Sequence, residues 1–154
     1  MPRNYSISGN ATNTQSSTLP LFTVISTANV RPEIYSFTLS SDAAPADHIA
    51  KYIFQRCSTA GTPGSSITPV ALDSVADEPA PVVTSGLAVF SAGPTLTANK
   101  IAYQVAVHQR IPYRWDCKDG KEIVLPATAA NGIAVLPTVV DSAFNTVFSL
   151  QYRE

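Results

Sequence analysis

Residues 101–118, IAYQVAVHQRIPYRWDCK, alternate in polarity over their whole length, and this alternation constrains the fold more than any other feature of the chain. Apart from Gln109, one parity is entirely apolar: Ile101, Tyr103, Val105, Val107, Gln109, Ile111, Tyr113, Trp115 and Cys117. Because successive side chains of a strand point to opposite faces, the pattern predicts one apolar wall and one polar wall. Since the parity survives Pro112, it predicts one long bent ribbon, with the proline at an edge, a bulge or a joint.

The Asp119-Gly120 pair follows this stretch directly. Such a pair supplies the two positive φ angles of a tight β-hairpin turn. The sequence therefore predicts a hairpin here, with a return strand that starts over 121–124.

Further short strands are predicted on both sides of this stretch, separated by turns rich in proline and glycine. They cover 21–27, 33–40, 82–90 with a break at Gly86, 133–136, and a last strand through Phe144, Phe148, Leu150 and Tyr152. In the segment 33–40, Tyr35, Phe37 and Leu39 share one face. Residues 47–57 fit either a helix or a strand, and we interpret them as one helical turn near 45–50 followed by a strand to Ser58.

About eight to ten strands without a long amphipathic helix indicate an all-β chain, a single-domain antiparallel β-sandwich. The jelly-roll type is favoured over the immunoglobulin type because Trp115 lies only two residues from Cys117. We assign residues 1–20 to an extended N-terminal arm and 21–154 to the jelly-roll domain, with a loop-rich insertion at about 59–81. The arm is either a loose tail, with a short strand around Tyr5 and Ile7, or a strand added to a neighbouring subunit. The insertion either faces a partner or packs along the edge of the sandwich.

Charged residues make up only 14% of the chain, against about 25% in an ordinary globular domain. The formal net charge of -1 offers no basic excess, so nucleic acid is not expected as a partner. No apolar run approaches the ~20 residues of a membrane span, and the N-terminus lacks the apolar core of a secretory signal. We therefore expect no membrane partner, synthesis in a cytoplasm, and reduced thiols at Cys57 and Cys117. The low charge favours a protein that hides much of its surface against neighbours.

Candidate catalytic groups are sparse. His48 and His108 are the two histidines, and the nucleophile motif G-x-S-x-G is absent. Asp116, Asp119 and Glu122 surround the predicted turn but do not follow the spacing of a calcium loop. We expect no catalytic residues, no cofactor and no metal.

Basic residues form a predicted stripe on the polar wall: His108, Arg110, Arg114 and Lys118. The stripe is either neutralised by acidic residues of a neighbouring strand or extended across a subunit interface, and we favour the interface. The residues proposed to contact partners are Arg3, Tyr5, Arg31, His108, Arg110 and Arg114.

Several short motifs resemble small head proteins of tailed bacteriophages: 3–7, Arg31-Pro32, 44–47, Gln55-Arg56, 59–62, 68–73, Gln109-Arg110, Arg114-Trp115 and 126–133. The chain is thereby similar to head decoration, or cement, proteins. The resemblance implies a jelly-roll domain, commonly a homotrimer, that binds the major capsid protein on the outer capsid surface where capsomers meet. It implies a virion protein synthesised in the host cytoplasm, and it transfers no active-site residues.

Two other functions stay open from the sequence. A tail, baseplate or fibre module would bind host glycans through exposed aromatic rings, and Tyr113 and Trp115 would then have to face solvent, although their parity predicts core positions. A small hydrolase would use one of the two histidines.

Overall fold

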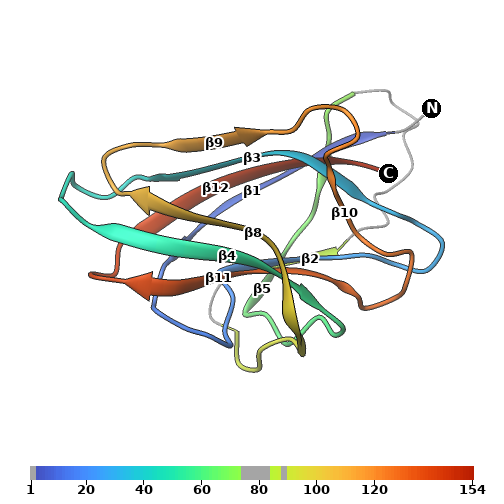
Figure 1. The fold of residues 1–154 in the computed structure, drawn as a ribbon, viewed down its shortest axis with the longest axis horizontal. Coiled ribbons are helices and arrows are strands. Elements are labelled where there is room, and N and C mark those ends of the chain that lie inside the picture. The colour runs from blue at the N-terminus through green and yellow to red at the C-terminus, as the bar shows by residue number, and fades with distance from the viewer. Residues whose placement is uncertain (1–2, 74–83, 88–89) are drawn as a thin grey trace.

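The structure, a computed structural model, describes residues 3–73, 84–87 and 90–154. These residues form two antiparallel β-sheets and no helix. Figure 1 shows the sheets as two layers, with both termini at the same end of the molecule. The prediction of an all-β chain built from antiparallel sheets is confirmed.

Each sheet contains six strands. Sheet A consists of β10 (Ile123–Val124), β3 (Glu33–Ser41), β12 (Asn145–Arg153), β1 (Asn4–Thr12) and β6 (Val70–Ala71) in spatial order, with β9 (Tyr113–Asp116) also paired to β3. Sheet B has the order β5 (Ser65–Ile67), β7 (Thr84–Leu87), β2 (Phe22–Ile25), β11 (Gly132–Val140), β4 (Ile49–Cys57) and β8 (Leu96–His108). Long-range pairs dominate both sheets, and β1 pairs with β12 over its whole length, from Asn4 opposite Arg153 to Thr12 opposite Asn145.

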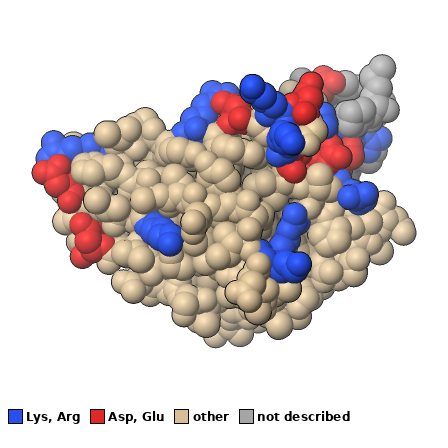
Figure 2. Space-filling view, viewed as in Figure 1, with Lys and Arg blue, Asp and Glu red and all other residues tan. Residues whose placement is uncertain are grey.

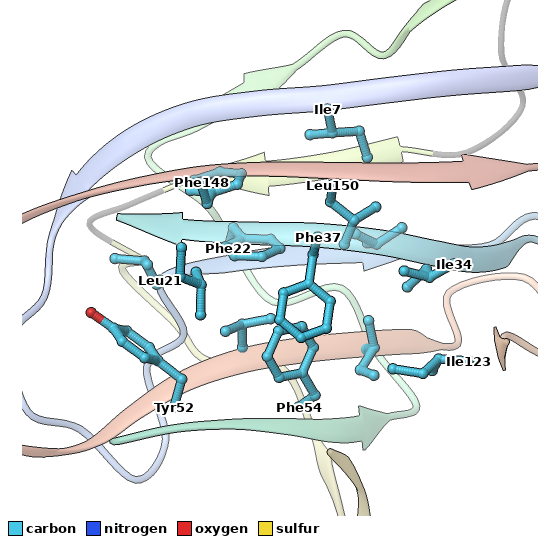
Figure 3. Packing of buried hydrophobic residues seen from close by; sticks show 14 of the residues in the cluster. Ile7, Leu21, Phe22, Ile34, Phe37, Tyr52, Phe54, Ile123, Phe148 and Leu150 are labelled. Carbon is cyan, nitrogen blue, oxygen red and sulfur yellow. The ribbon is translucent and has the colours of Figure 1, made fainter. Parts of the chain in front are cut away.

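The core lies between the two sheets. Alternate residues of β12 are buried, as their parity predicts, and they face buried residues of β11 and β4. Phe22 from sheet B stacks on Phe148 from sheet A with 3.9 Å between ring centroids, and Phe37 meets Phe54 at 4.5 Å. Figure 3 shows these rings reaching toward each other from opposite layers. Aromatic side chains therefore hold the two layers together.

The single ribbon predicted for 101–118 is wrong, because the chain changes sheets in the middle of it. β8 belongs to sheet B and β9 to sheet A, and residues 109–112 form the turn between them. Pro112 lies at this joint, one of the positions that its missing N–H favours. Tyr103, Val105, Val107, Tyr113 and Trp115 nevertheless all pack on the core, as predicted. Ile111 lies in the turn and is 65% exposed, so its predicted place on the apolar wall is wrong.

The hairpin predicted at Asp119-Gly120 is also wrong. A turn does form there, but only Gly120 has a positive φ, +78°. The next strand, β10, pairs with β3 and not with β9. Both β9 and β10 run antiparallel to β3, so the chain makes an excursion between them and then continues in the same direction along the edge of β3.

Two irregularities in strand pairing change which side chains face the core. Between Tyr152 and Gln151 of β12, β3 contributes an extra residue, Tyr35, so that Ile34 takes the core position predicted for Tyr35. In β8 the pairing with β4 slips at Ala102, and Ile101 therefore points outward and is 47% exposed. A bulge of one residue reverses the parity beyond it.

The helical turn predicted near 45–50 is wrong, since residues 44–48 are irregular and β4 starts at Ile49. The strand predicted to follow it is confirmed.

Residues 4–12, assigned to the N-terminal arm, form β1 between β12 and β6 of their own chain. In the predicted insertion at 59–81, β5 extends one edge of sheet B and β6 extends one edge of sheet A. Residues 74–81 of this insertion lie outside the described residues. The same holds for 82–83 and 88–89 of the segment predicted as a strand at 82–90. The predicted break at Gly86 is wrong, because β7 runs through it.

A buried polar network crosses the core where β1 ends. Asn13 is fully buried, and its side-chain amide donates to the Tyr52 hydroxyl at 2.9 Å while its side-chain oxygen accepts from the Phe144 backbone N–H at 2.7 Å. The Tyr52 hydroxyl also bonds Thr146 at 2.7 Å. These bonds join both sheets in a region where water cannot replace a lost partner.

We expect Asn13→Ala to lower the free energy of unfolding by about 1–3 kcal/mol, because the Phe144 N–H would be left buried without its acceptor. Urea denaturation followed by circular dichroism measures this loss. The matched control is Asn10→Ala, an exposed residue on β1, the strand that ends just before Asn13, and a change within about 0.5 kcal/mol is expected. Equal stability of the two variants would contradict a stabilising role for the network.

Candidate interaction surface

One side of the molecule presents two strands that lack a second neighbour within the described residues. β8 pairs only with β4, and β9 pairs only with β3. We call this side the β8–β9 edge and define it by residues 96–108 and 113–116. Its outer backbone N–H and C=O groups are available to an added strand.

Few side chains along β8 are charged. Ala102, Gln104 and Ala106 are exposed, and Lys100 is the only lysine or arginine of the strand. On the neighbouring strands the outer face of sheet B carries Ile49, 48% exposed, Val139, 52% exposed, and one cation, Lys51, which pairs in register with Ala106 and with Val139. In Figure 2 the middle of the molecule is mostly tan and carries only separate blue patches. Proteins normally protect long edge strands with charges, prolines or bulges, and over 101–108 this edge carries none of these except the slip at Ala102.

An aromatic cluster closes the gap between the two edge strands. Tyr103 of β8 and Tyr113 of β9 share a hydrogen bond between their hydroxyls. Trp115 stacks on Phe37 with 5.1 Å between centroids, and Tyr103 meets Phe37 edge-on at 5.5 Å. Burial, followed by the bond to Tyr103, raises the pKa of Tyr113 to about 12, so this hydroxyl stays protonated at neutral pH. The cluster joins the free edge of sheet B to that of sheet A.

Carboxylates neutralise the basic residues at the ends of this edge. The Arg110 guanidinium lies 2.8 Å from Asp47, which is also 3.8 Å from His108 Nε2. Arg114 lies 2.6 Å from Asp116, and this bond, together with one from Ser36, lowers the pKa of the Asp116 carboxyl. Lys118 lies in the loop after β9. The predicted basic stripe is therefore divided over two sheets and a loop. Its two arginines pair with Asp47, in a loop, and with Asp116, on the same strand as Arg114, and not with a neighbouring strand.

The six residues proposed to contact partners are not brought together. Tyr5 is fully buried and stacks on Tyr152 at 5.5 Å, so it belongs to the core. Arg3 is exposed beside the C-terminus, where its backbone pairs with Glu154. Arg31 lies in the β2–β3 loop. Only His108, Arg110 and Arg114 lie at or beside the β8–β9 edge.

The described residues do not assemble the alternative chemistries. His48 lies 3.6 Å from Asp141 at the surface, and His108 accepts from the Arg110 backbone N–H and lies 3.8 Å from Asp47. Asp116 and Glu122 are engaged by Arg114 and Arg153 respectively. Within the same ranges, no group of three histidine, cysteine or acidic side chains is placed to share a metal ion. The core packing of Trp115 covers the ring face that a glycan platform would present.

Sequence reasoning missed the free edge of β8. The alternation identified the strand, but strand pairing is set by contacts between distant residues, and the sequence contained no sign of which strand would lie at the edge. The one available signal was the scarcity of charge between residues 101 and 107.

Comparisons with known proteins identify no relative: no family model, no curated protein and no solved structure matches the chain. The part of the chain that the structure describes contains no helix long and apolar enough to cross a membrane.

Proposed function

We propose that this chain is a non-enzymatic virion protein of a tailed bacteriophage, which decorates and stabilises the outer capsid by bridging capsomers as a homotrimer. The observation that carries the proposal is the β8–β9 edge, a long strand edge with few charges and no second neighbour in the described residues. An edge of this kind is a template for pairing with another chain. The resemblance of the short motifs to head decoration proteins supplies the identity of the partner, the major capsid protein.

We further propose that the domain is a β-sandwich of the jelly-roll type. The pairing of its principal strands supports this: β1 pairs with β12, β2 with β11, β3 with β9, and β4 with β8. We count β5–β7 and β10 as additions to the principal strands. The first four principal strands, β1 to β4, then pair in order with the last four taken in reverse, β12, β11, β9 and β8. A two-stranded antiparallel ribbon that is rolled into two sheets would produce this order, and the order therefore supports the jelly-roll proposal.

The physical basis for a stabilising role is the area that such a module buries. A standard interface of about 1,600 Å² spans affinities from micromolar to picomolar, and repetition over many capsomer seams multiplies a modest affinity. A homotrimer presents the same contacts three times, which suits a three-fold position between capsomers. Arg110 pairs with Asp47 and Arg114 pairs with Asp116. A partner that covers the β8–β9 edge therefore removes water from few unpaired charges.

The direct test is co-sedimentation with expanded phage heads. The heads come from the phage that encodes this protein and are assembled in its absence. We expect the protein to pellet with the heads at about 10 µM, and native mass spectrometry to find a trimer. Gln104→Lys together with Ala106→Lys adds charge beside the free edge and should abolish pelleting. Ser8→Lys, an exposed position on β1 in the other sheet, is the matched control and should pellet like the wild type.

Absence of pelleting by the wild-type protein would refute the capsid proposal. Pelleting that the β8 substitutions leave unchanged would refute the assignment of the β8–β9 edge as the contact surface. A strict monomer at high concentration would refute the trimer.

A further inference from the structure

A second feature lies at the start of β8, at the end of the sandwich where β4 finishes. A cavity of about 370 Å³ is lined by the side chains of Arg31, Arg56 and Lys100, and no aspartate or glutamate lines it. Arg110, Arg114 and Arg153 each pair with a carboxylate, whereas these three cations have no ion pair within the described residues. In Figure 2, red atoms gather at the upper rim and the left end, while the blue atoms of the lower half lie among tan atoms.

Arg56 is the central group of this cavity. It pairs in register with Ile133, a fully buried core residue, so its side chain leaves sheet B on the inner face. Its Nη1 atom is buried and has no hydrogen-bond partner. Burial lowers the pKa of the Arg56 guanidinium, as expected for a charge that has lost water without gaining an anion. A buried guanidinium nitrogen without an acceptor is unfavourable unless a ligand supplies one.

Lys100 reaches the cavity through an irregularity of β8. Between the pairs Gln55–Ile101 and Cys57–Leu96, β8 contributes extra residues, and Asn99 adopts a positive φ of 57°. The Gln55 side chain donates to the Thr97 carbonyl at 3.0 Å and holds this bulge against β4. Bulges of this kind redirect side chains at sheet edges and are typical of functional positions.

The other wall of the cavity is apolar and comes from Val124, at the end of β10, and from Pro126, in the segment between β10 and β11. The volume is within the range of small-molecule sites and exceeds the needs of a bare inorganic ion. An occupant that satisfies both walls carries an anionic oxygen group on an organic body. Arginine binds such groups with two parallel hydrogen bonds, and a neighbouring lysine adds a point charge.

We propose that this cavity binds a small organic oxyanion, a phosphate monoester or a carboxylate, with its anionic group held by Arg56, Arg31 and Lys100 and its organic body against Val124 and Pro126. The site shares Lys100 with the end of the β8–β9 edge, but the proposal does not depend on capsid binding. Phosphate and carboxylate share the recognition chemistry, and the experiment distinguishes them.

The test uses the full chain and isothermal titration calorimetry with phenyl phosphate, benzoate and inorganic phosphate. We expect saturable binding of phenyl phosphate or benzoate, tighter than that of inorganic phosphate because only the organic probes contact the apolar wall. The tighter of the two organic probes identifies the class of anion. Arg56→Met should weaken the binding about 10- to 100-fold, the effect of losing hydrogen bonds between charged groups.

Arg56→Met also provides a readout that a structural role would not give. Arg56 is partly buried and its Nη1 atom has no hydrogen-bond partner, so an apolar side chain of similar length should leave the thermal stability of the unliganded protein unchanged or raise it. Lys118→Gln removes an exposed cation outside the cavity and should bind like the wild type. No saturable binding of either organic probe at up to about 10 mM, or equal binding by wild type and Arg56→Met, would overturn the proposal.

Discussion

Phe37→Ala is expected to reduce the free energy of unfolding by about 3–5 kcal/mol, the largest single loss that we predict for this chain. Phe37 is 1% exposed and contacts aromatic rings from both sheets. Its centroid lies 4.5 Å from Phe54, 5.1 Å from Trp115 and 5.5 Å from Tyr103. Truncation to alanine removes all of these ring contacts and leaves a cavity between the layers. Since a domain is typically stable by only about 5–15 kcal/mol, the variant should be close to unfolding at moderate temperature.

Urea denaturation followed by far-ultraviolet circular dichroism measures this loss, and the fluorescence of Trp115, the only tryptophan of the chain, reports the packing around Phe37. The control is Ile111→Ala. Sequence parity places Ile111 on the same apolar wall as Trp115, but the structure exposes it, so a change within about 0.5 kcal/mol is expected. A large effect at Ile111, or a small one at Phe37, would contradict the assignment of the core.

Gly132→Ala is expected to destabilise the protein at or above the top of the range of about 1–3 kcal/mol that overpacking usually costs. An added Cβ at this position would lie 2.1 Å from the Val24 carbonyl oxygen and 2.9 Å from the Ile25 Cα. Both contacts are with the backbone of β2, which pairs with β11 here, so no side-chain rotation relieves them. We therefore expect the two strands to separate locally and sheet B to lose stability.

The comparison for this prediction is Gly120→Ala. Gly120 has a positive φ, but an added Cβ there would meet nothing within 4 Å, so only the backbone conformation is penalised, by about 1–2 kcal/mol. Denaturation midpoints of the two variants and the wild type separate steric overlap from conformational strain. If Gly132→Ala were no more harmful than Gly120→Ala, the close approach of β11 and β2 would be wrong.

The predictions that succeeded depend on local information. Alternating polarity identified the strands that became β3, β8, β9 and β12, because a strand that packs one face on a core must alternate with a period of two. The same alternation placed Tyr103, Tyr113 and Trp115 on the core. The proposals of capsid decoration and of a jelly roll use this information together with the resemblance of short motifs.

The predictions that failed depend on contacts between residues far apart in the chain. Whether 101–118 is one strand or two is decided by which strands border it, and here β4 and β3 lie in different sheets. The extra residues at Tyr35 and Ala102 reverse the parity of their strands, and no local pattern announces such a bulge. The pairing of β1 with β12 likewise converts a polar N-terminus into a central strand.

The sequence by itself determined that the chain is built from strands, where most of them lie, and that its surface carries few charges, since composition and two-residue periodicity are properties of neighbouring residues. Only the tertiary structure decided that β8 and β9 lie at sheet edges in the described part of the chain, and which cations meet at one cavity. Arg31, Arg56 and Lys100 come from a loop, the end of one strand and the bulge of another, and they converge because sheet pairing and a local bulge bring separate parts of the chain together.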